Sequence, residues 1–185
     1  MPQIHSHNPN RWRFAAAPLT GPASPYTVTD LGTLGGPVTK AMGVNDAGDV
    51  VGASQTGSYL HGFTWTDGTM TDLGDLGGQG SWAYDVNAVG QVVGGSPLGS
   101  GDNHAFLWQN GGMQDLGTLG GDYSSAEAIN EDGEVVGTAR LANSTPHAFL
   151  WQNGAMQDLG SLGWNQSIAY DINDDGMVVG ALQTG

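Results

Sequence analysis

The chain has 185 residues, no cysteine, and 18 acidic against 4 basic residues, for a net charge of −14. This acid excess argues against nucleic acid and anionic membranes as partners, because both are bound through Lys and Arg. Without cysteine, disulfides and thiolate sites are excluded. The 32 glycines disfavour long helices and suit turns and bulges. No apolar run approaches the roughly 18 residues that cross a bilayer, so we expect no membrane insertion.

Residues 1–25 are predicted to form an N-terminal arm that contains a strand. Arg11, Trp12, Arg13 and Phe14 alternate basic and aromatic side chains, which places both aromatics on one face of a strand. Prolines at positions 18, 22 and 25 favour an extended connection after it. Residues 26–32 then predict a second strand.

Residues 26–185 are predicted to form one four-unit β-repeat domain, with units beginning near residues 30, 72, 115 and 158. The sequence Asp-Leu-Gly recurs at intervals of 42, 43 and 43 residues, and three other marks keep this period. They are an Asn before a turn (Asn45, Asn87, Asn130, Asn173), the Gly of Val-Val-Gly (Gly52, Gly94, Gly137, Gly180) and a His (His61, His104, His147). Several marks with one period indicate an internal repeat.

Each complete unit predicts four short strands, which in the second unit cover residues 83–87, 91–94, 104–108 and 113–116. Gly-containing turns between them favour an antiparallel meander. His104, Phe106 and Trp108 share one strand face, and we expect this aromatic face to be the buried one. The prediction is an all-β fold, a tandem repeat of four-stranded antiparallel units of about 43 residues that is β-propeller-like. A β-solenoid is the alternative.

A family resemblance rests on His-Ala-Phe-Leu-Trp at residues 104–108 and again at 147–151, followed each time by Gln-Asn-Gly, Met-Gln and Asp-Leu-Gly. With these motifs, residues 26–185 resemble the HAF family of extracellular repeats, named for the His-Ala-Phe tripeptide. The first unit departs from the pattern, with His-Gly-Phe-Thr-Trp at residues 61–65. The resemblance implies an extracellular or cell-surface β-repeat protein, and it supplies no catalytic residues.

The fourth unit ends after its second strand, and the N-terminal arm supplies strands that resemble the missing third and fourth. These strands either close a ring within one chain or complete the open end of another copy. The second arrangement is heterologous and generates a filament if it does not close. We therefore expect Arg11, Trp12, Arg13 and Phe14 to be assembly residues.

Two further candidate sites have structural interpretations. The repeated His is expected to be a hydrogen-bonding cap at the end of the sheet. Asp171, Asn173 and Asp175 match the first half of a calcium loop, but no Glu stands at the twelfth place, so a turn is the favoured interpretation. Because nearly every polar feature recurs in several units, the sequence predicts neither an enzyme nor a cofactor.

Two functions stay open. The first is a non-catalytic extracellular structural protein that assembles with itself through its arm and repeat ends. The alternative is a carbohydrate-binding β-propeller module with a glycan as partner. Trp82 and Trp164 follow the Leu-Gly loop in only two units. If exposed, they would stack on sugar rings, which favours the alternative, and the other interpretation is that they wedge between neighbouring units.

Overall fold

The structure is a computed structural model that describes residues 28–184, and all its regular secondary structure is β. These residues contain fourteen strands and no helix, which confirms the all-β prediction. None of the sheets that these residues form closes on itself. Within the same range, no helix could span a membrane.

The strands form three sets of four and a final pair, and within each set consecutive strands pair antiparallel. The first set is β1 (Thr39–Val44), β2 (Val50–Thr56), β3 (Tyr59–Thr66) and β4 (Thr69–Asp72). The second set is β5 (Trp82–Val86), β6 (Val92–Pro97), β7 (Asn103–Gln109) and β8 (Gly112–Asp115). The third set is β9 (Gly120–Ile129), β10 (Val135–Leu141), β11 (Pro146–Gln152) and β12 (Ala155–Asp158). The terminal pair is β13 (Gln166–Ile172) and β14 (Val178–Gln183).

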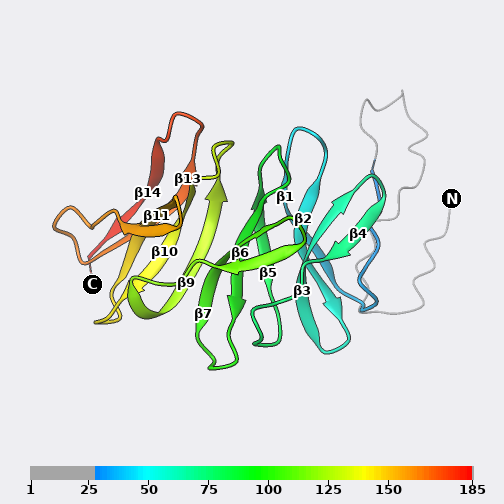
Figure 1. Cartoon of the computed structure of the whole chain (residues 1–185), viewed down its shortest axis with the longest axis horizontal. Coiled ribbons are helices and arrows are strands. Elements are labelled where there is room, and N and C mark those ends of the chain that lie inside the picture. The colour runs from blue at the N-terminus through cyan, green and yellow to red at the C-terminus, as the bar shows by residue number, and fades with distance from the viewer. Residues whose placement is uncertain (1–27, 185) are drawn as a thin grey trace, which may run out of the picture.

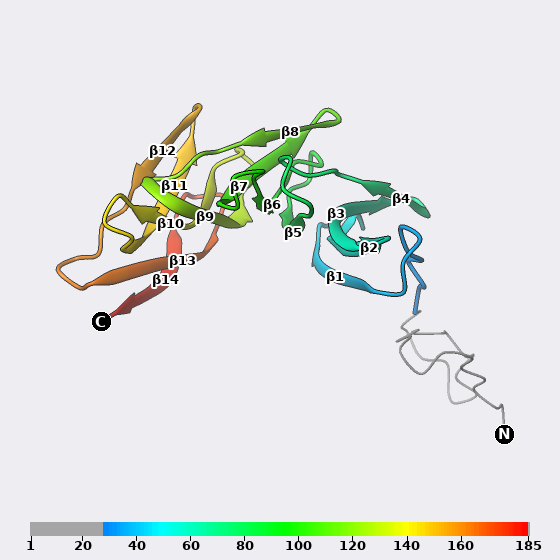
Figure 2. The same ribbon diagram turned by 90° about the horizontal axis from the view of Figure 1, so that it is seen from below.

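These sets follow one another in a row along the longest axis of the molecule (Figure 1). The first set lies at one end, and the third set lies with the terminal pair at the other. The view turned by 90° shows that the row is curved, with the terminal pair below the third set (Figure 2). The first strand of each later group, β5, β9 or β13, packs against the preceding set. One parallel residue pair, Asn103 with Tyr123, links the second set to the third. The arrangement is therefore an open, repeat-like row of antiparallel sheets.

A β-bulge at the same place in every group explains the recurrent glycine of Val-Val-Gly. In the second set, the register between β5 and β6 shifts between Ala83 and Asp85. The bulge brings the two backbones so close that a Cβ at Gly94 would overlap the carbonyl oxygen of Trp82. The equivalent glycines of the other groups meet the same obstacle. Only glycine fits there, because it has no Cβ.

The core lies between neighbouring sets, and it uses both faces of the middle sheets. Phe63, Phe106 and Phe149 are fully buried, which confirms the prediction for these aromatics. Trp108 is only partly buried, and the opposite face of its strand, with Ala105 and Leu107, is buried as well. The expectation of a single buried face was therefore wrong for the middle of the row, because each sheet there has a neighbour on both sides.

The structure departs from the sequence-based expectation before β1. No strand forms over residues 28–32, the described part of the strand predicted at 26–32. In each set the fourth strand pairs with the third. The strand predicted at residues 26–32 was expected to be such a fourth strand, and its expected partner is the strand at residues 11–14. Those residues, which include the assembly candidates Arg11, Trp12, Arg13 and Phe14, fall outside the described residues.

Candidate interaction surfaces at the ends of the row

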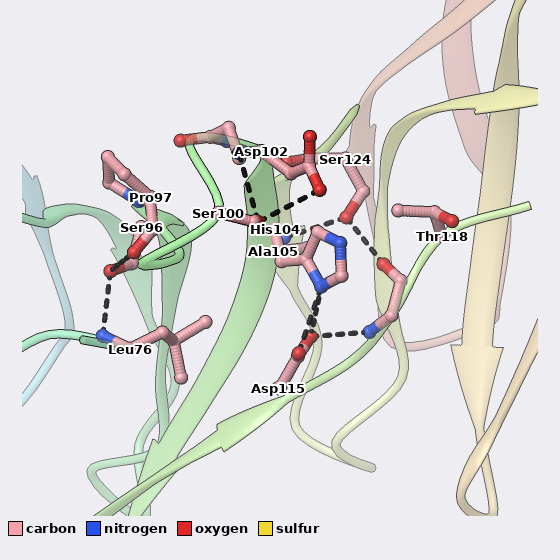
Figure 3. A network of polar contacts seen from close by, with 12 residues as sticks. Leu76, Ser96, Pro97, Ser100, Asp102, His104, Ala105, Asp115, Thr118 and Ser124 are labelled. Atoms are coloured by element: carbon pink, nitrogen blue, oxygen red, sulfur yellow. Dashed lines mark hydrogen bonds and ion pairs between the residues drawn. The ribbon is translucent and has the colours of Figure 1, made fainter. Parts of the chain in front are cut away.

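The repeated His is held by the Asp of Asp-Leu-Gly in each complete set. His104 Nδ1 lies 2.8 Å from Asp115 Oδ1 (Figure 3), and His61 with Asp72 and His147 with Asp158 repeat the contact at 3.0 and 2.9 Å. Since an ionised carboxylate only accepts hydrogen bonds, Nδ1 carries the proton. The pair joins the third strand to the end of the fourth, as expected for an end cap of the sheet.

A serine continues this network into the next group of strands. Asp115 Oδ1 also accepts the Gly117 N–H at 2.7 Å, and Ser124 Oγ donates to the Gly117 carbonyl oxygen at 2.5 Å (Figure 3). The same Oγ accepts the Ala105 N–H at 2.8 Å. Although Ser, His and Asp lie close together, the Ser hydroxyl bonds to backbone groups and not to the imidazole. The geometry is that of a sheet connector, not of a nucleophile with its base.

Of the calcium candidates, Asp171 lies near the end of β13, and Asn173 and Asp175 lie in the turn between β13 and β14. Asn173 Oδ1 accepts the Met177 N–H at 2.8 Å, and Asp171 Oδ1 accepts the Ile172 N–H at 2.9 Å. Asp175 is exposed in the same turn. Among residues 28–184, no group of three or more His, Cys, Asp or Glu side chains is arranged to hold a metal ion.

The two tryptophans proposed for glycan stacking differ in exposure. Trp82 is partly buried at the start of β5, whereas Trp164 is 50% exposed in the loop before β13. A shallow, mostly polar hollow of about 470 Å³ lies beside this loop, lined by Asn143, His147, Asn165 and Gln166 among others. Trp164 is therefore the exposed member of the pair.

Each internal junction pairs the second Val of Val-Val-Gly in one set with three apolar residues of the next group. Val51, Val93 and Val136 are fully buried at the three successive junctions. Their partner groups recur at equivalent positions: Ala83, Val86 and Val92, then Ala126, Ile129 and Val135, then Ala169, Ile172 and Val178. The apolar contact between neighbours is thus built in the same way three times.

A ladder of asparagine side chains runs along the row and fixes the register of these junctions. Asn45 Nδ2 donates to the carbonyl oxygen of Asn87 at 3.0 Å, Asn87 to that of Asn130 at 3.1 Å, and Asn130 to that of Asn173 at 3.2 Å. Each Oδ1 accepts the N–H four residues on, which holds the amide in place. Every rung therefore points toward the C-terminal end of the row.

Acidic side chains add further hydrogen bonds between neighbours. The Ala88 N–H donates to the Glu131 carboxylate at 2.9 Å, and the Glu131 N–H donates to Asp174 at 3.0 Å. In the opposite direction, the Ile129 N–H donates to Asp85 Oδ2 at 2.9 Å. These backbone donors and carboxylates are complementary across the second and third junctions.

The last group repeats one side of such a junction, and among residues 28–184 no further group of strands packs on it. Val179, the second Val of its Val-Val-Gly, is 61% exposed. Its neighbours Asp171, Asn173 and Asp174 are exposed too. We call Val179 and these three residues the C-terminal face. The exposed large apolar side chains from the end of β12 onward are Leu159, Leu162, Trp164, Tyr170, Met177, Val179 and Leu182.

The first set presents the other side of a junction. Ala41, Val44 and Val50 stand where Ala83, Val86 and Val92 stand in the second set. Val44 is 66% exposed, while its counterparts Val86, Ile129 and Ile172 are buried. We call Ala41, Val44, Val50, Asn45 and Asp46 the N-terminal face. The two ends of the row are therefore opposite halves of one kind of junction.

A carboxylate beside the N-terminal face orients the first rung of the ladder. Asp49 accepts Thr66 Oγ1 at 2.6 Å and Asn45 Nδ2 at 2.9 Å. These two hydrogen bonds, with the one from Thr66 the larger cause, hold the pKa of Asp49 below its usual value. The charged form of Asp49 therefore helps to position the Asn45 amide.

No known protein-family model matches the chain, and no curated protein matches it.

Proposed function

We propose that the protein is a non-catalytic extracellular structural β-repeat protein whose copies assemble through the ends of the row and the N-terminal arm, into a filament. The observation that carries the proposal is the exposure of Val179. A residue whose three counterparts are fully buried is more than half exposed, on a sheet face against which no other group within residues 28–184 packs. Exposed apolar surface of this kind marks an interaction site in a soluble protein.

We also propose that the four groups of strands are a tandem repeat of about 43 residues with a β-propeller-like arrangement. It is supported by the four-stranded meander of each set and by the equivalent junctions between sets. In a β-solenoid, strands of successive coils would pair with one another along their length. Here strands pair over several residues only within a set, and the second and third sets are joined by a single residue pair. This pattern favours the propeller-like arrangement over the solenoid.

The edge of the terminal pair supports a role for the arm. β14 pairs with β13, and the described residues supply no third strand beyond it, whereas the other groups have four strands. An open strand edge offers unpaired N–H and C=O groups to another segment. The arm, with Arg11, Trp12, Arg13 and Phe14, is our candidate for that segment, taken from another copy.

The absence of catalysis is supported by how the polar residues are used. The clusters that contain Ser, His and Asp recur in each complete set, and their hydrogen bonds tie strands together. An active site needs an unoccupied nucleophile or base in a cleft. The extracellular location rests on the resemblance to the HAF repeats.

Sedimentation velocity over a range of concentrations, with negative-stain microscopy of the same samples, tests the proposal. We expect the full chain to form larger species as its concentration rises and to appear as linear polymers. A species of 19.0 kDa at all concentrations up to about 100 μM would rule out self-assembly as the function.

Carbohydrate binding is kept as a second candidate because of the exposed Trp164 and the polar hollow beside its loop. Aromatic side chains next to amide and hydroxyl groups suit sugar rings, which have apolar faces and polar edges. Titration with a panel of neutral oligosaccharides, followed by tryptophan fluorescence, tests it. A fluorescence change that Trp164→Ala abolishes and Trp82→Ala leaves intact supports glycan binding, and no change with any sugar excludes it for that panel.

A further inference from the structure

We propose that the C-terminal face of one copy docks on the N-terminal face of a second copy, in the register of the internal junctions. The contact has one direction, head to tail. This inference rests on the proposed function and adds to it which surfaces meet, how they are oriented and which atoms set the register.

The apolar parts of the two faces match. At the internal junctions, Val51, Val93 and Val136 each pack with an Ala and two branched aliphatic residues of the next group. Val179 offers the first half of this contact, and Ala41, Val44 and Val50 of the next copy offer the second. Burying them removes apolar area from water, which favours association.

The asparagine ladder would continue across the contact. Asn173 Nδ2 is the next donor in the series, and no hydrogen bond from it forms within residues 28–184. The carbonyl oxygen of Asn45 is the matching acceptor. It accepts the Gly48 N–H, and the equivalent carbonyl of Asn87 accepts both the Gly90 N–H and the Asn45 amide. Asn45 therefore has room for one further donor.

Carboxylates at both faces would also continue the hydrogen bonds from backbone N–H groups to carboxylates that are seen at the internal junctions. Asp46 stands at the position of Glu131 and Asp174 in the other groups. Within the chain, the Glu131 N–H donates to the Asp174 carboxylate. In the same way, the Asp174 N–H of one copy would donate to the Asp46 carboxylate of the next. Asp171 stands at the position of Asp85, and its Oδ1 accepts the following N–H as Asp85 does. Its Oδ2 would accept the Val44 N–H, as Asp85 Oδ2 accepts that of Ile129.

The direction of the ladder determines the kind of assembly. Each copy has one donor face and one acceptor face, so a pair of copies leaves one face of each kind open. A contact between different surfaces is heterologous, and it forms an open filament unless rotation closes a ring. Because each copy has a net charge of −14, salt should strengthen the association by screening repulsion.

The test uses Val44→Asp to block the N-terminal face and Val179→Asp to block the C-terminal face. Both side chains are more than half exposed, so the folded monomer should tolerate either change. Val89→Asp is the matched control, because Val89 is also exposed but belongs to neither face. Sedimentation velocity is measured for each variant alone and for an equimolar mixture of V44D and V179D.

We expect each single variant to associate at least about tenfold more weakly than wild type, because an Asp would be buried against apolar groups. V89D should assemble as wild type does. The mixture should form a one-to-one dimer that grows no further, since V44D retains a C-terminal face and V179D an N-terminal face. Circular dichroism should show that all variants keep the β spectrum.

Other outcomes would distinguish a failure of the contact between the two faces from a failure of the proposed function. If V44D alone dimerises while V179D does not, two C-terminal faces meet and the head-to-tail direction is wrong. If wild type and both single variants assemble alike, another surface, such as one formed by residues 1–27, carries assembly and the face contact is wrong. If wild type never associates, the proposed function itself fails.

Discussion

Val136 and Val179 hold the same place in Val-Val-Gly of neighbouring groups, yet their environments are opposite. Val136 is fully buried between the third set and the terminal pair, and Val179 is 61% exposed. Their local sequences and bulged hairpins are alike. Burial in this row is therefore decided by the presence of a neighbouring group and not by the hairpin itself.

The largest expected contrast comes from putting Asp at each of these two positions. Val136→Asp places a charge in a junction without a partner for it, which should cost more than about 4 kcal/mol of unfolding free energy and leave little folded protein. Val179→Asp should change the monomer by less than about 0.5 kcal/mol. Urea denaturation at low protein concentration measures both. Similar losses of unfolding free energy at the two sites would show that the neighbouring group does not decide burial.

A second test concerns the buried aromatics. Phe106→Ala should cost about 3–5 kcal/mol, because it opens a cavity at a fully buried site between the first and second sets. Trp108→Ala should cost less, since that side chain is only partly buried. The midpoints of urea unfolding give the order, and a larger loss for Trp108 would contradict the packing described here.

A smaller contrast comes from the asparagine ladder. Asn87→Asp keeps the oxygen that accepts the Gln91 N–H but replaces the donor to Asn130 with a second oxygen. At this buried site we expect a loss of about 1–3 kcal/mol. Asn173→Asp makes the same change in an exposed residue, so it should leave thermal unfolding unchanged and weaken assembly. A drop in monomer stability for N173D would show that its amide is already engaged.

The sequence alone predicted the hairpins and the period, because turn residues and alternation are local. It identified the four asparagines but explained them as turn residues, which accounts only for Oδ1. The bonds from Nδ2 to the next carbonyl depend on how sets pack, and no local pattern encodes that register. The pairing of His104 with Asp115 had a signal, since His and Asp stand 11 residues apart in three units.

Whether the row of sets is open or closes into a ring could not be predicted from the sequence. The count of strands allowed both a closed ring and an open array, because ring closure depends on small rotations between sets. Within residues 28–184 no sheet closes, and the first set and the terminal pair lie at opposite ends (Figure 1). The exposure of Val44 and Val179 follows from that geometry.

The smallest expected effect is a shift in one pKa at the N-terminal face. Thr66→Val removes the hydrogen bond that is the main cause of the lowered pKa of Asp49, so the pKa should rise toward its usual value. Because the folded-state pKa lies below the unfolded one, the stabilising contribution of this carboxylate is present above the unfolded pKa and is lost as pH falls through the folded one. Carboxyl NMR titration measures it, with Thr71→Val as the control. An unchanged pKa in T66V would contradict this contact.

Hydrogen exchange in dilute and in concentrated solution tests most directly that the end faces are unfilled copies of the internal junctions. In dilute solution, amides of β13 and β14 should exchange much faster than those of β9 and β10. In concentrated solution, exchange in β13, β14 and β1 should slow, while β9 and β10 stay as they were. If the terminal strands exchange at the same rate in both solutions although the protein has associated, the end faces do not form the contact and the account is contradicted.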